Sequence, residues 1–339
     1  MSQTLVIRLS ALGDVAMLIP VLYSCAKQYP QEKFLLITKE SLLALFEHKP
    51  SNVSVFPVDT ENRHKGIGGL KRLINDLRKQ NIENVADMHD VLRSKVIRTC
   101  FWFLGRKVAV IKKERKKRKT LIRKNHKILQ AQKTSFEKYH KVFHLLGYDF
   151  SIDFKSVFEF GVRDFDQIKH IVGAKTNIWT GIAPFAKHKG KVYPFEKMSQ
   201  VIKLLASDSD KTIFLFGGKD EQSQLAQLAS PYSNVISIFD KNLTLSAELL
   251  LMSYLDAMIT MDSGNMHLAS LVGVPVISIW GATHPYAGFY GYGQDASNAI
   301  QVDLFCRPCS VYGNKLCYRN NYECMELITP EMIVSKLFN

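Results

Sequence analysis

Short apolar runs alternate with amphipathic segments along this chain, and the alternation occurs twice. Apolar runs in the first half predict strands at 5–9, 33–38, 53–58 and 84–88. Runs in the second half predict strands at 180–183, 212–216, 235–238, 257–260 and 276–280. Helical spacing of apolar residues predicts helices at 15–28, 41–47, 66–79, 92–104, 195–206, 221–229, 246–254, 266–272 and 330–338. This alternation predicts two α/β domains with helix-covered parallel sheets, divided between 162 and 175.

The composition is that of a folded protein without a membrane span. A chain of 339 residues is long enough for two domains with separate cores. Its 46% hydrophobic and 22% charged residues exclude a disordered chain. No apolar stretch approaches the roughly 18–20 residues of a membrane-spanning helix, and Asp14 interrupts any signal-peptide-like run at the N-terminus. We therefore expect a cytoplasmic protein.

Almost all of the net charge of +14 lies in one segment. Between Arg106 and Lys141 the chain carries 15 Lys or Arg residues against two Glu residues, so the remainder is nearly neutral. We expect the part at 112–133, with its scattered apolar residues, to be an exposed, mobile loop or helix pair. Such a segment favours an anionic partner. The alternatives are a phosphorylated substrate, an anionic membrane surface and a nucleic acid. A solubilising loop is the alternative interpretation.

The richest polar constellation is Asp262-Ser263-Gly264, with His267 one helical turn later. It lies between a predicted strand and a predicted helix, where parallel sheets bind ligands and helix N-termini offer free N–H groups. Gly264 permits close approach of the backbone to a diphosphate, and Ser263 is able to cap the helix or bind phosphate. Spacing alone leaves open the simpler interpretation of a capped helix after a turn.

Two further strand ends carry weaker signals of the same kind. Gly217 and Gly218 end the strand at 212–216, which indicates either a turn or a nucleotide contact. Lysines 187, 189 and 191 follow the strand at 180–183, and either form a solvated loop or neutralise a diphosphate.

Asp14 stands where the first strand turns into the first helix, within Ser10-Ala-Leu-Gly-Asp14. A carboxylate at this position is able to accept a proton from a hydroxyl group as a general base, or to cap the helix. The turn is not GxGxxG and gives no support to dinucleotide binding.

Four cysteines cluster near the C-terminus, at 306, 309, 317 and 324. The first pair has the CxxC spacing of a zinc site, but the second pair does not. We favour packed, reduced thiols over a bound metal, and disulfides are disfavoured in a reducing cytoplasm.

Three stretches together resemble glycosyltransferase family 9, the ADP-heptose–lipopolysaccharide heptosyltransferases and their relatives. They are SALGDVAMLIP near the N-terminus, DSGNMHLASLVGVPVISIWGATHP in the second half and the tail CRPC…C…CMELITPE. Their order and span cover the chain from its first strand to its last helix. The resemblance implies a GT-B fold, in which two Rossmann-like, doubly wound α/β domains face each other across a cleft.

The resemblance also implies a division of labour. It places an acceptor domain with the basic segment 106–141 at 1–170, a nucleotide-sugar domain at 171–325, and a terminal helix at 326–339 that packs back on the first domain. The implied reaction is inverting transfer of a heptose from ADP-heptose to a lipopolysaccharide-core or other surface-glycan acceptor, without metal or cofactor. The protein would work at the inner face of the cytoplasmic membrane, in peripheral contact with it.

Individual residues match the family's motifs. Asp14 matches the proposed catalytic base, while Glu137 and Tyr139 resemble part of a short motif whose role is open. The expected donor-binding residues are Lys191, Gly217, Gly218, Leu243, Asp262, Ser263, Gly264 and His267. Attraction of an anionic acceptor and membrane is expected from Lys112, Lys113, Arg115, Lys116, Lys117, Arg118 and Lys119.

Departures from the family pattern leave the donor open. The loop before Lys191 reads AKHKGK where the family often has small hydroxyl residues. Lys219 follows Gly218 where ribose recognition favours an acid, and Glu221 is the possible substitute. The alternatives are a GT-B transferase with another nucleotide-sugar, an epimerase and a homologue that binds without catalysis. A nucleic-acid-binding protein is disfavoured, because no Phe, Tyr or Trp for base stacking lies between 112 and 133.

Overall fold

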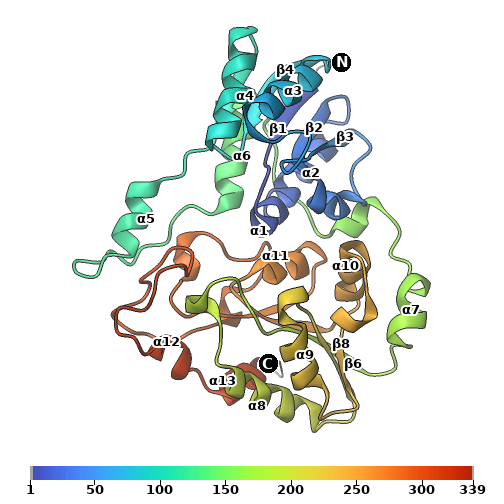
Figure 1. Ribbon diagram of the computed structural model, residues 1–339, viewed down its shortest axis with the longest axis vertical. Coiled ribbons are helices and arrows are strands. Elements are labelled where there is room, and N and C mark those ends of the chain that lie inside the picture. The colour runs from blue at the N-terminus through green and yellow to red at the C-terminus, as the bar shows by residue number, and fades with distance from the viewer. Residues whose placement is uncertain (1–2, 338–339) are drawn as a thin grey trace. The chain divides into compact units, whose positions relative to one another are not determined.

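The computed structural model describes residues 3–337 and consists of two α/β units, each built around its own parallel sheet (Figure 1). The first unit contains the chain up to Lys113 and the return segment Ser135–Val162. The second contains Glu114–Thr134 and the chain from Arg163 onward. The prediction of two doubly wound parallel-sheet domains is confirmed.

The first unit has a parallel sheet of strand order β3-β2-β1-β4-β5. The strands are β1 (Gln3–Ile7), β2 (Lys33–Lys39), β3 (Val53–Val58), β4 (Ile82–Asp87) and β5 (Lys107–Val110). The α-helices are α1 (Leu12–Ala16), α2 (Ile19–Gln28), α3 (Gly66–Arg78), α4 (Leu92–Phe103) and α6 (Ser135–Leu146). Two 3-10 helices are η1 (Glu40–Phe46) and η2 (Val157–Phe160).

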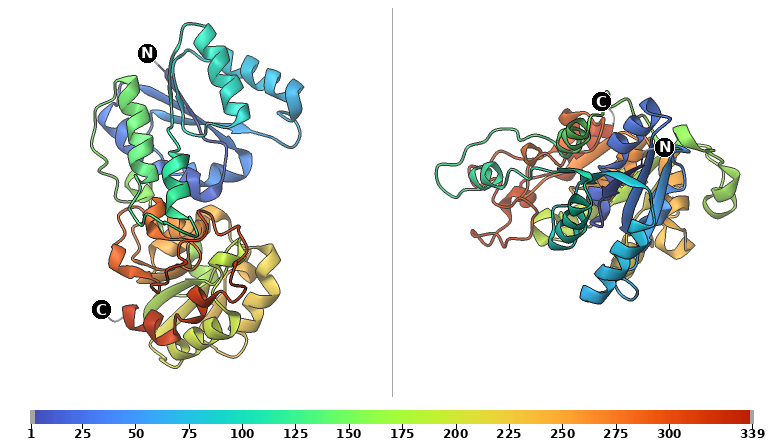
Figure 2. Two further views of the ribbon diagram at one scale, coloured as in Figure 1. Left: turned by 90° about the vertical axis from the view of Figure 1, so that its left-hand side faces the viewer. Right: turned by 90° about the horizontal axis from the view of Figure 1, so that it is seen from above.

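The central strands of this sheet are buried on both faces, which is why 5–7 of β1 and 34–37 of β2 are continuous apolar runs. Successive strand residues point to opposite faces. Leu35 and Ile37 of β2 join the core formed with Leu73 of α3 and other residues of α3 and α4. Phe34 instead meets the ring of Phe143 on α6, at 6.1 Å between centroids. Figure 2 (left) shows α6, in green, on one side of the blue strands and α3 and α4 on the other.

The second unit has a parallel sheet of order β11-β10-β9-β6-β7-β8. Its strands are β6 (Ile178–Ala183), β7 (Lys211–Leu215), β8 (Val235–Ser237), β9 (Ala257–Met261), β10 (Val276–Ile279) and β11 (Ala299–Ile300). Its α-helices are α5 (Arg115–Leu121), α7 (Asp166–Val172), α8 (Phe195–Ala206), α9 (Gln222–Ala229), α10 (Leu245–Ser253), α11 (Gly264–Leu271), α12 (Glu323–Glu326) and α13 (Pro330–Val334). The 3-10 helices are η3 (Lys189–Lys191), η4 (Lys219–Glu221), η5 (Phe239–Lys241), η6 (Pro285–Ala287), η7 (Ala296–Asn298) and η8 (Ser335–Leu337).

Several elements differ from the sequence prediction. The helix expected at 15–28 is two helices, because Pro20 has no N–H to donate and interrupts a continuous helix. Strands β5 and β11 and helix α6 were missed. The charge of the segment 106–141 masked β5 and the helical spacing of Phe136, Tyr139 and Phe143. Within residues 3–337, no helix has the length and apolar character to cross a bilayer.

Two segments belong elsewhere than expected. Residues 114–134 pack on the second unit, whereas the whole basic segment was assigned to a first domain ending at 170. Leu121 is buried, and the side chain of Arg118 is buried against Phe289 and Tyr312 of the second unit. The terminal helix α13 packs on α8 of the second unit, with Ile333 in its core. Phe338 and Asn339, at the end of the expected terminal helix, lie outside the described residues.

Candidate functional site

The strand order of the first unit reverses beside β1. From β1 the chain runs outward through β2 and β3, then returns to β4 on the other side of β1. Loops leaving the carboxyl ends of β1 and β4 therefore diverge, and ligands of open parallel sheets bind in such crevices. The loop after β1 leads to Asp14, and the loop after β4 carries His89 and Asp90.

Asp14 is held from two directions. The guanidinium of Arg8, a residue only 6% exposed, pairs with its carboxylate and donates to the carbonyl of Met88 at 2.7 Å. The hydroxyl of Tyr139 on α6 donates to the backbone carbonyl of Asp14 at 3.2 Å. The role of Tyr139, open in the sequence, is thus to hold the Asp14 turn, while Glu137 is exposed on the same helix. The Asp14 side chain keeps 35% of its surface exposed, so a hydroxyl group is able to reach it.

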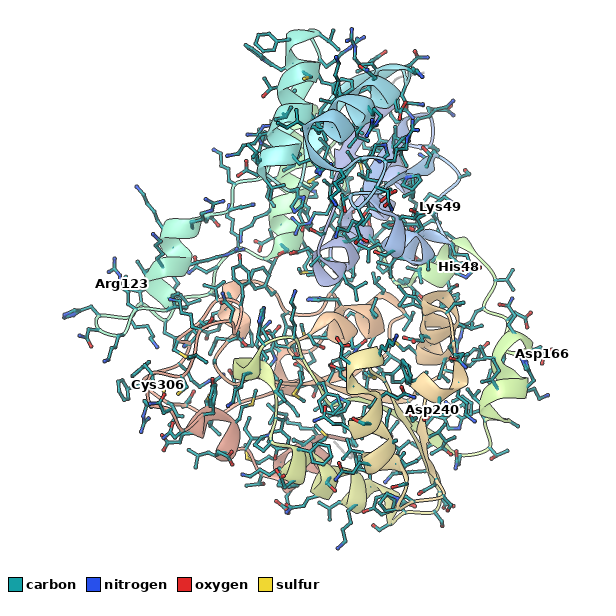
Figure 3. The ribbon with its side chains drawn as sticks, viewed as in Figure 1. His48, Lys49, Arg123, Asp166, Asp240 and Cys306 are labelled. Atoms are coloured by element: carbon teal, nitrogen blue, oxygen red, sulfur yellow. The ribbon has the colours of Figure 1, made fainter. Side chains whose placement is uncertain are left out.

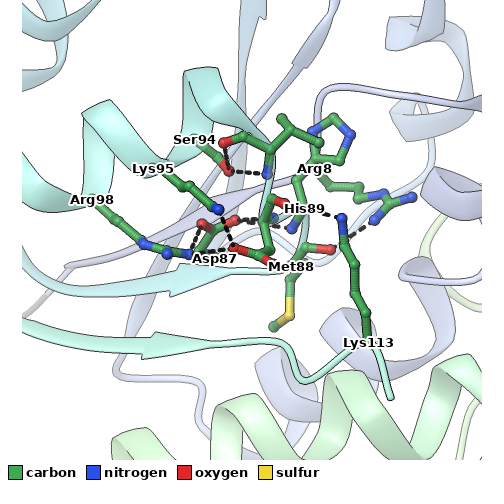
Figure 4. Close-up of polar contacts among 10 residues, drawn as sticks. Arg8, Asp87, Met88, His89, Ser94, Lys95, Arg98 and Lys113 are labelled. Carbon is green, nitrogen blue, oxygen red and sulfur yellow. Dashed lines mark hydrogen bonds and ion pairs between the residues drawn. The ribbon is translucent and has the colours of Figure 1, made fainter. Parts of the chain in front are cut away.

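A second carboxylate, which sequence reasoning missed, builds the loop after β4 (Figure 4). Asp87 is fully buried and pairs with Arg98 at 2.7 Å. It also accepts hydrogen bonds from the backbone N–H of His89 at 2.9 Å and of Asp90 at 2.8 Å. The signal available in the sequence was an acid at the end of an apolar strand, within Asp87-Met-His-Asp90.

His89 is neutral in this setting. Burial, together with the positive charges of Arg8 and Lys113, lowers its pKa to about 4, against the opposing effect of Asp14 and Asp87. Lys113 is anchored by a 3.0 Å hydrogen bond to the carbonyl of Asp90. The loops after β1 and β4 thus bring together a partly exposed carboxylate, two cations and a neutral imidazole, a set suited to proton acceptance from an anionic substrate.

The second unit has the same kind of reversal, beside β6. From β6 the chain runs outward through β7 and β8, then returns to β9 on the other side of β6. Lys191 follows β6 and Asp262 follows β9, and their side chains form an ion pair of 2.8 Å. The two side chains are only 16% and 5% exposed. The structure therefore brings together two residues of the predicted donor set that lie 71 positions apart in the sequence.

Close glycine packing fixes the stem of Lys191. A Cβ atom at Gly190 would lie 2.9 Å from both the Cβ of Ala282 and the carbonyl oxygen of Gly313. Gly313 has a positive φ of 76°, and a Cβ there would lie 2.6 Å from the Cγ of Lys191. A side chain at Gly313 would therefore displace the stem of Lys191, and one at Gly190 would separate the Lys191 loop from Ala282 and Gly313.

Helix α11 begins beside this ion pair. Ser263 occupies the N-cap position, but its hydroxyl meets that of Thr260 at 3.2 Å and makes no cap hydrogen bond within the helix. The first turn, from Gly264, presents backbone N–H groups that have no acceptor within the helix, at its positive end. His267 is 7% exposed and lies one turn into the helix. This arrangement suits an anion such as a phosphate.

The Gly217–Gly218 turn is closed by its own helix. Glu221 accepts a hydrogen bond from the backbone N–H of Gly218 at 2.8 Å, and a Cβ at Gly217 would lie 2.7 Å from the same carboxylate oxygen. Lys219 is exposed, and Leu243 is half-buried just before the N-cap of α10. The turn therefore explains why two glycines stand here. Contact of Gly217, Gly218 or Leu243 with a nucleotide stays a prediction.

Arg307 is a structural centre of the second unit that the sequence did not single out. Its guanidinium, in a residue 4% exposed, donates to the carbonyls of Gly281 at 2.6 Å, Trp280 at 3.1 Å and Thr283 at 3.1 Å. It thereby ties the C-terminal tail to the loop that follows β10. Only its place within the Cys-Arg-Pro-Cys stretch could have drawn attention to it.

The four C-terminal cysteines line one cavity of about 10 Å³. All four are free thiols in the structure. Among the described residues, no three His, Cys, Asp or Glu side chains are arranged to hold a metal ion. Whether the cluster holds packed thiols or takes up a metal stays a prediction.

The seven basic residues expected to attract an anion do not form one set. Arg118 is buried, donating to the Tyr312 hydroxyl at 3.1 Å with its guanidinium 4.6 Å from the Phe289 ring, so its assignment to an exposed surface was wrong. Lys113 belongs to the first unit, where it donates to the Asp90 carbonyl in the loop after β4. Five remain exposed: Lys112, Arg115, Lys116, Lys117 and Lys119.

Comparison with known proteins supports the resemblance seen in the motifs. The lipooligosaccharide heptosyltransferase 2 of Campylobacter jejuni serotype O:2 is 26% identical over 131 residues, which are 38% of this chain and 40% of that protein. The chain thus matches less than half the length of this curated relative. A glycosyltransferase family 9 structure from Veillonella parvula shares the fold with a TM-score of 0.75 and 19% identity, covering 98% of this chain and 95% of its own.

A second solved structure, E. coli heptosyltransferase WaaC with ADP-2-deoxy-2-fluoro heptose, has a TM-score of 0.68 and 18% identity. The structural match covers 99% of this chain and 98% of the WaaC chain. At these identities the two structures show the fold alone. The sequence model of "Glycosyltransferase family 9 (heptosyltransferase)" matches residues 70–318, well over half of the chain. The chain therefore belongs to glycosyltransferase family 9.

Proposed function

We propose that this protein is an inverting glycosyltransferase that moves a heptose from ADP-heptose to a lipopolysaccharide-core or other surface-glycan acceptor. The observation that carries the proposal is the Lys191–Asp262 ion pair at the strand reversal, beside the N-terminus of α11. Family membership makes a sugar donor the expected ligand of this site. The bound ADP-heptose analogue of WaaC supports ADP-heptose in particular.

The donor diphosphate would lie against the first turn of α11. Its negative charge would be met by the helix N-terminus, by the Gly264 backbone and by the ammonium of Lys191. Ser263 and His267 would supply further hydrogen bonds, and Leu243 an apolar contact for the adenine. As the sugar leaves, charge develops on the diphosphate and the same groups stabilise it, without a metal ion in this proposal.

Asp14 would act as the general base. Its carboxylate takes the proton of an acceptor hydroxyl, which attacks the anomeric carbon from the side opposite the diphosphate and inverts its configuration. The Arg8 pair and the Tyr139 hydrogen bond hold the carboxylate in place for this step. Proton transfer of this kind contributes about a hundredfold to ten-thousandfold in rate.

The acceptor would be an anionic, lipid-linked glycan. The exposed cations Lys112, Arg115, Lys116, Lys117 and Lys119 would draw it toward the protein by long-range attraction. Long-range attraction acts mainly on association rates and weakens with salt, so transfer to a phosphorylated acceptor should slow as ionic strength rises.

Thermal unfolding with nucleotides tests the donor, and a transfer assay tests the base. ADP and ADP-heptose should raise the unfolding temperature, whereas UDP and GDP should not. Asp14→Asn should keep this stabilisation and lose at least about a hundredfold in transfer rate. Stabilisation by another nucleotide and not by ADP would contradict ADP-heptose as the donor. An unchanged transfer rate in Asp14→Asn would contradict Asp14 as the general base.

A further inference from the structure

Two segments that are remote in sequence form one surface on the second unit, which we name the basic–apolar face. It consists of residues 114–134 and 305–319. The ammonium of Lys127 donates to the carbonyls of Phe305 at 3.1 Å and Pro308 at 2.9 Å, and that of Lys124 lies 4.9 Å from the ring centre of Tyr318. Figure 3 shows Arg123 and Cys306, one from each segment, on the same side of this unit.

Large apolar side chains project from this face. Leu316 is 81% exposed and Phe305 77%, while Ile128 and Leu129 are each 53% exposed. Single exposed apolar residues are ordinary, but a group of them on two touching segments indicates an interaction site.

The same two segments are rich in cations. Residues 114–134 carry nine Lys or Arg against one Glu, and residues 305–319 carry three against no acid. Arg118 and Arg307 are buried and serve the fold. Arg115, Lys116, Lys119, Arg123, Lys124 and Lys315 stay exposed, so the face is strongly positive.

The face is held in shape. Leu121 is completely buried and Arg118 is sealed under Phe289, which anchors α5. Phe305 and Leu316 precede Cys306 and Cys317 in the sequence, two cysteines that line the small cavity described above. The Phe305 carbonyl is also held by Lys127, so part of the face is already ordered before it meets a partner.

We infer that the basic–apolar face docks on an anionic phospholipid bilayer. Cations near such a surface bind the headgroups, and apolar side chains among them enter the boundary between headgroups and acyl chains. The aliphatic Ile128, Leu129 and Leu316 and the ring of Phe305 suit this boundary, and the aliphatic side chains offer the bases of a nucleic acid no ring to stack on. The inference deepens the proposed function and rests on it, because it names where the membrane of a lipid-linked acceptor meets the protein.

Vesicle co-sedimentation tests the inference. The full chain should bind vesicles of phosphatidylcholine and phosphatidylglycerol and should not bind phosphatidylcholine alone. Reversing three exposed charges, Arg123→Glu, Lys124→Glu and Lys315→Glu, should weaken binding by at least about tenfold, and so should Phe305→Ser with Leu316→Ser. Matched controls at exposed positions elsewhere, Lys71→Glu, Lys169→Glu and Lys203→Glu, or Ile67→Ser with Leu204→Ser, should bind like wild type.

Stabilisation by ADP, measured on every variant, separates this inference from the proposed function. Variants of the basic–apolar face should keep wild-type unfolding temperatures and ADP stabilisation while they lose vesicle binding. Equal binding by face and control variants, no binding to anionic vesicles, or tighter binding to a single-stranded RNA than to the vesicles would overturn the docking. Vesicle binding without ADP stabilisation would leave the docking standing and remove the proposed donor.

Discussion

Lys191 and Asp262 form a 2.8 Å ion pair between the loops that follow β6 and β9, at the point where the strand order of the second unit reverses. Both side chains are largely shielded from water, so each depends on the other for its charge to be tolerated. The pair therefore has a structural role in the free protein as well as a proposed role in donor binding.

A double-mutant cycle separates these two roles. Lys191→Met should lower the free energy of unfolding by about 3 kcal/mol, because it leaves the Asp262 carboxylate buried without its partner. Lys191→Met with Asp262→Asn should recover most of that loss, as measured by urea denaturation. ADP binding, measured by calorimetry, should stay weak in both variants. Recovery of ADP affinity in the double variant would show that Lys191 acts only through the fold.

Gly313→Ala should disturb the same site from a distance. Its positive φ and the contact with the Lys191 stem predict a loss of about 1–2 kcal/mol in stability and weaker ADP binding. Gly68→Ala is the matched control, since it lies in helix α3 with no atom near the added methyl group, and it should stabilise by about 0.5–1 kcal/mol. Equal ADP affinity in Gly313→Ala and wild type would contradict the packing argument.

Tyr139→Phe tests how firmly the Asp14 turn must be held. The variant loses the hydrogen bond to the Asp14 carbonyl but keeps the ring, so the transfer rate should fall by up to about tenfold. The KM for the donor should stay unchanged, because Tyr139 contacts the Asp14 loop of the first unit and the proposed donor site lies in the second unit. A changed donor KM with an unchanged maximal rate would argue against this positioning role.

Glu248 predicts a dependence of stability on pH. Burial raises its pKa to about 7, above the ordinary value of 4.5. Between these values the unfolded chain gives up its proton first, so the free energy of unfolding falls as pH rises and is highest below 4.5. Glu248→Gln should match wild type at pH 4 and exceed it by about 3 kcal/mol at pH 8, measured by urea denaturation. A constant difference across that range would contradict the shift.

The thiols of the cysteine-lined cavity should differ in reactivity. Burial raises the pKa of Cys317, but the surrounding backbone N–H groups outweigh burial and bring it below the ordinary value. Burial raises the pKa of Cys309 and brings that of Cys324 to about 11. Iodoacetamide at neutral pH should therefore modify Cys317 before Cys309 and Cys324, as followed by mass spectrometry. Earlier modification of Cys324 would contradict this order.

Much of the fold was predictable because its signals are local. A strand buried on both faces has to be apolar throughout, and a helix that covers it has to repeat its apolar residues at helical spacing. Asp14 and the Asp262–His267 stretch were likewise found because each follows such a strand. The missed β5 and α6 lie in a stretch where charge obscured the apolar pattern.

The parts of the candidate site that escaped prediction depend on contacts between distant residues. Asp87 gave no sign of pairing with Arg98, and nothing local set Arg307 apart from other arginines. Tyr139 belonged to a motif, yet its contact with Asp14 spans 125 positions. Side chains of these types have many possible partners, and only packing selects among them.

The sequence by itself determined two α/β units, the strand ends that carry polar residues and a family of relatives, because periodicity and motif order are written along the chain. Only the tertiary structure decided that Lys191 pairs with Asp262 and that Arg8 and Tyr139 hold Asp14. It also decided that the basic residues 114–134 lie on the second unit beside residues 305–319. The physical reason is that a charged side chain has no preferred partner that its local sequence reveals. Its partner is fixed only when the strand order and the close packing of glycines bring distant loops together and bury the charge.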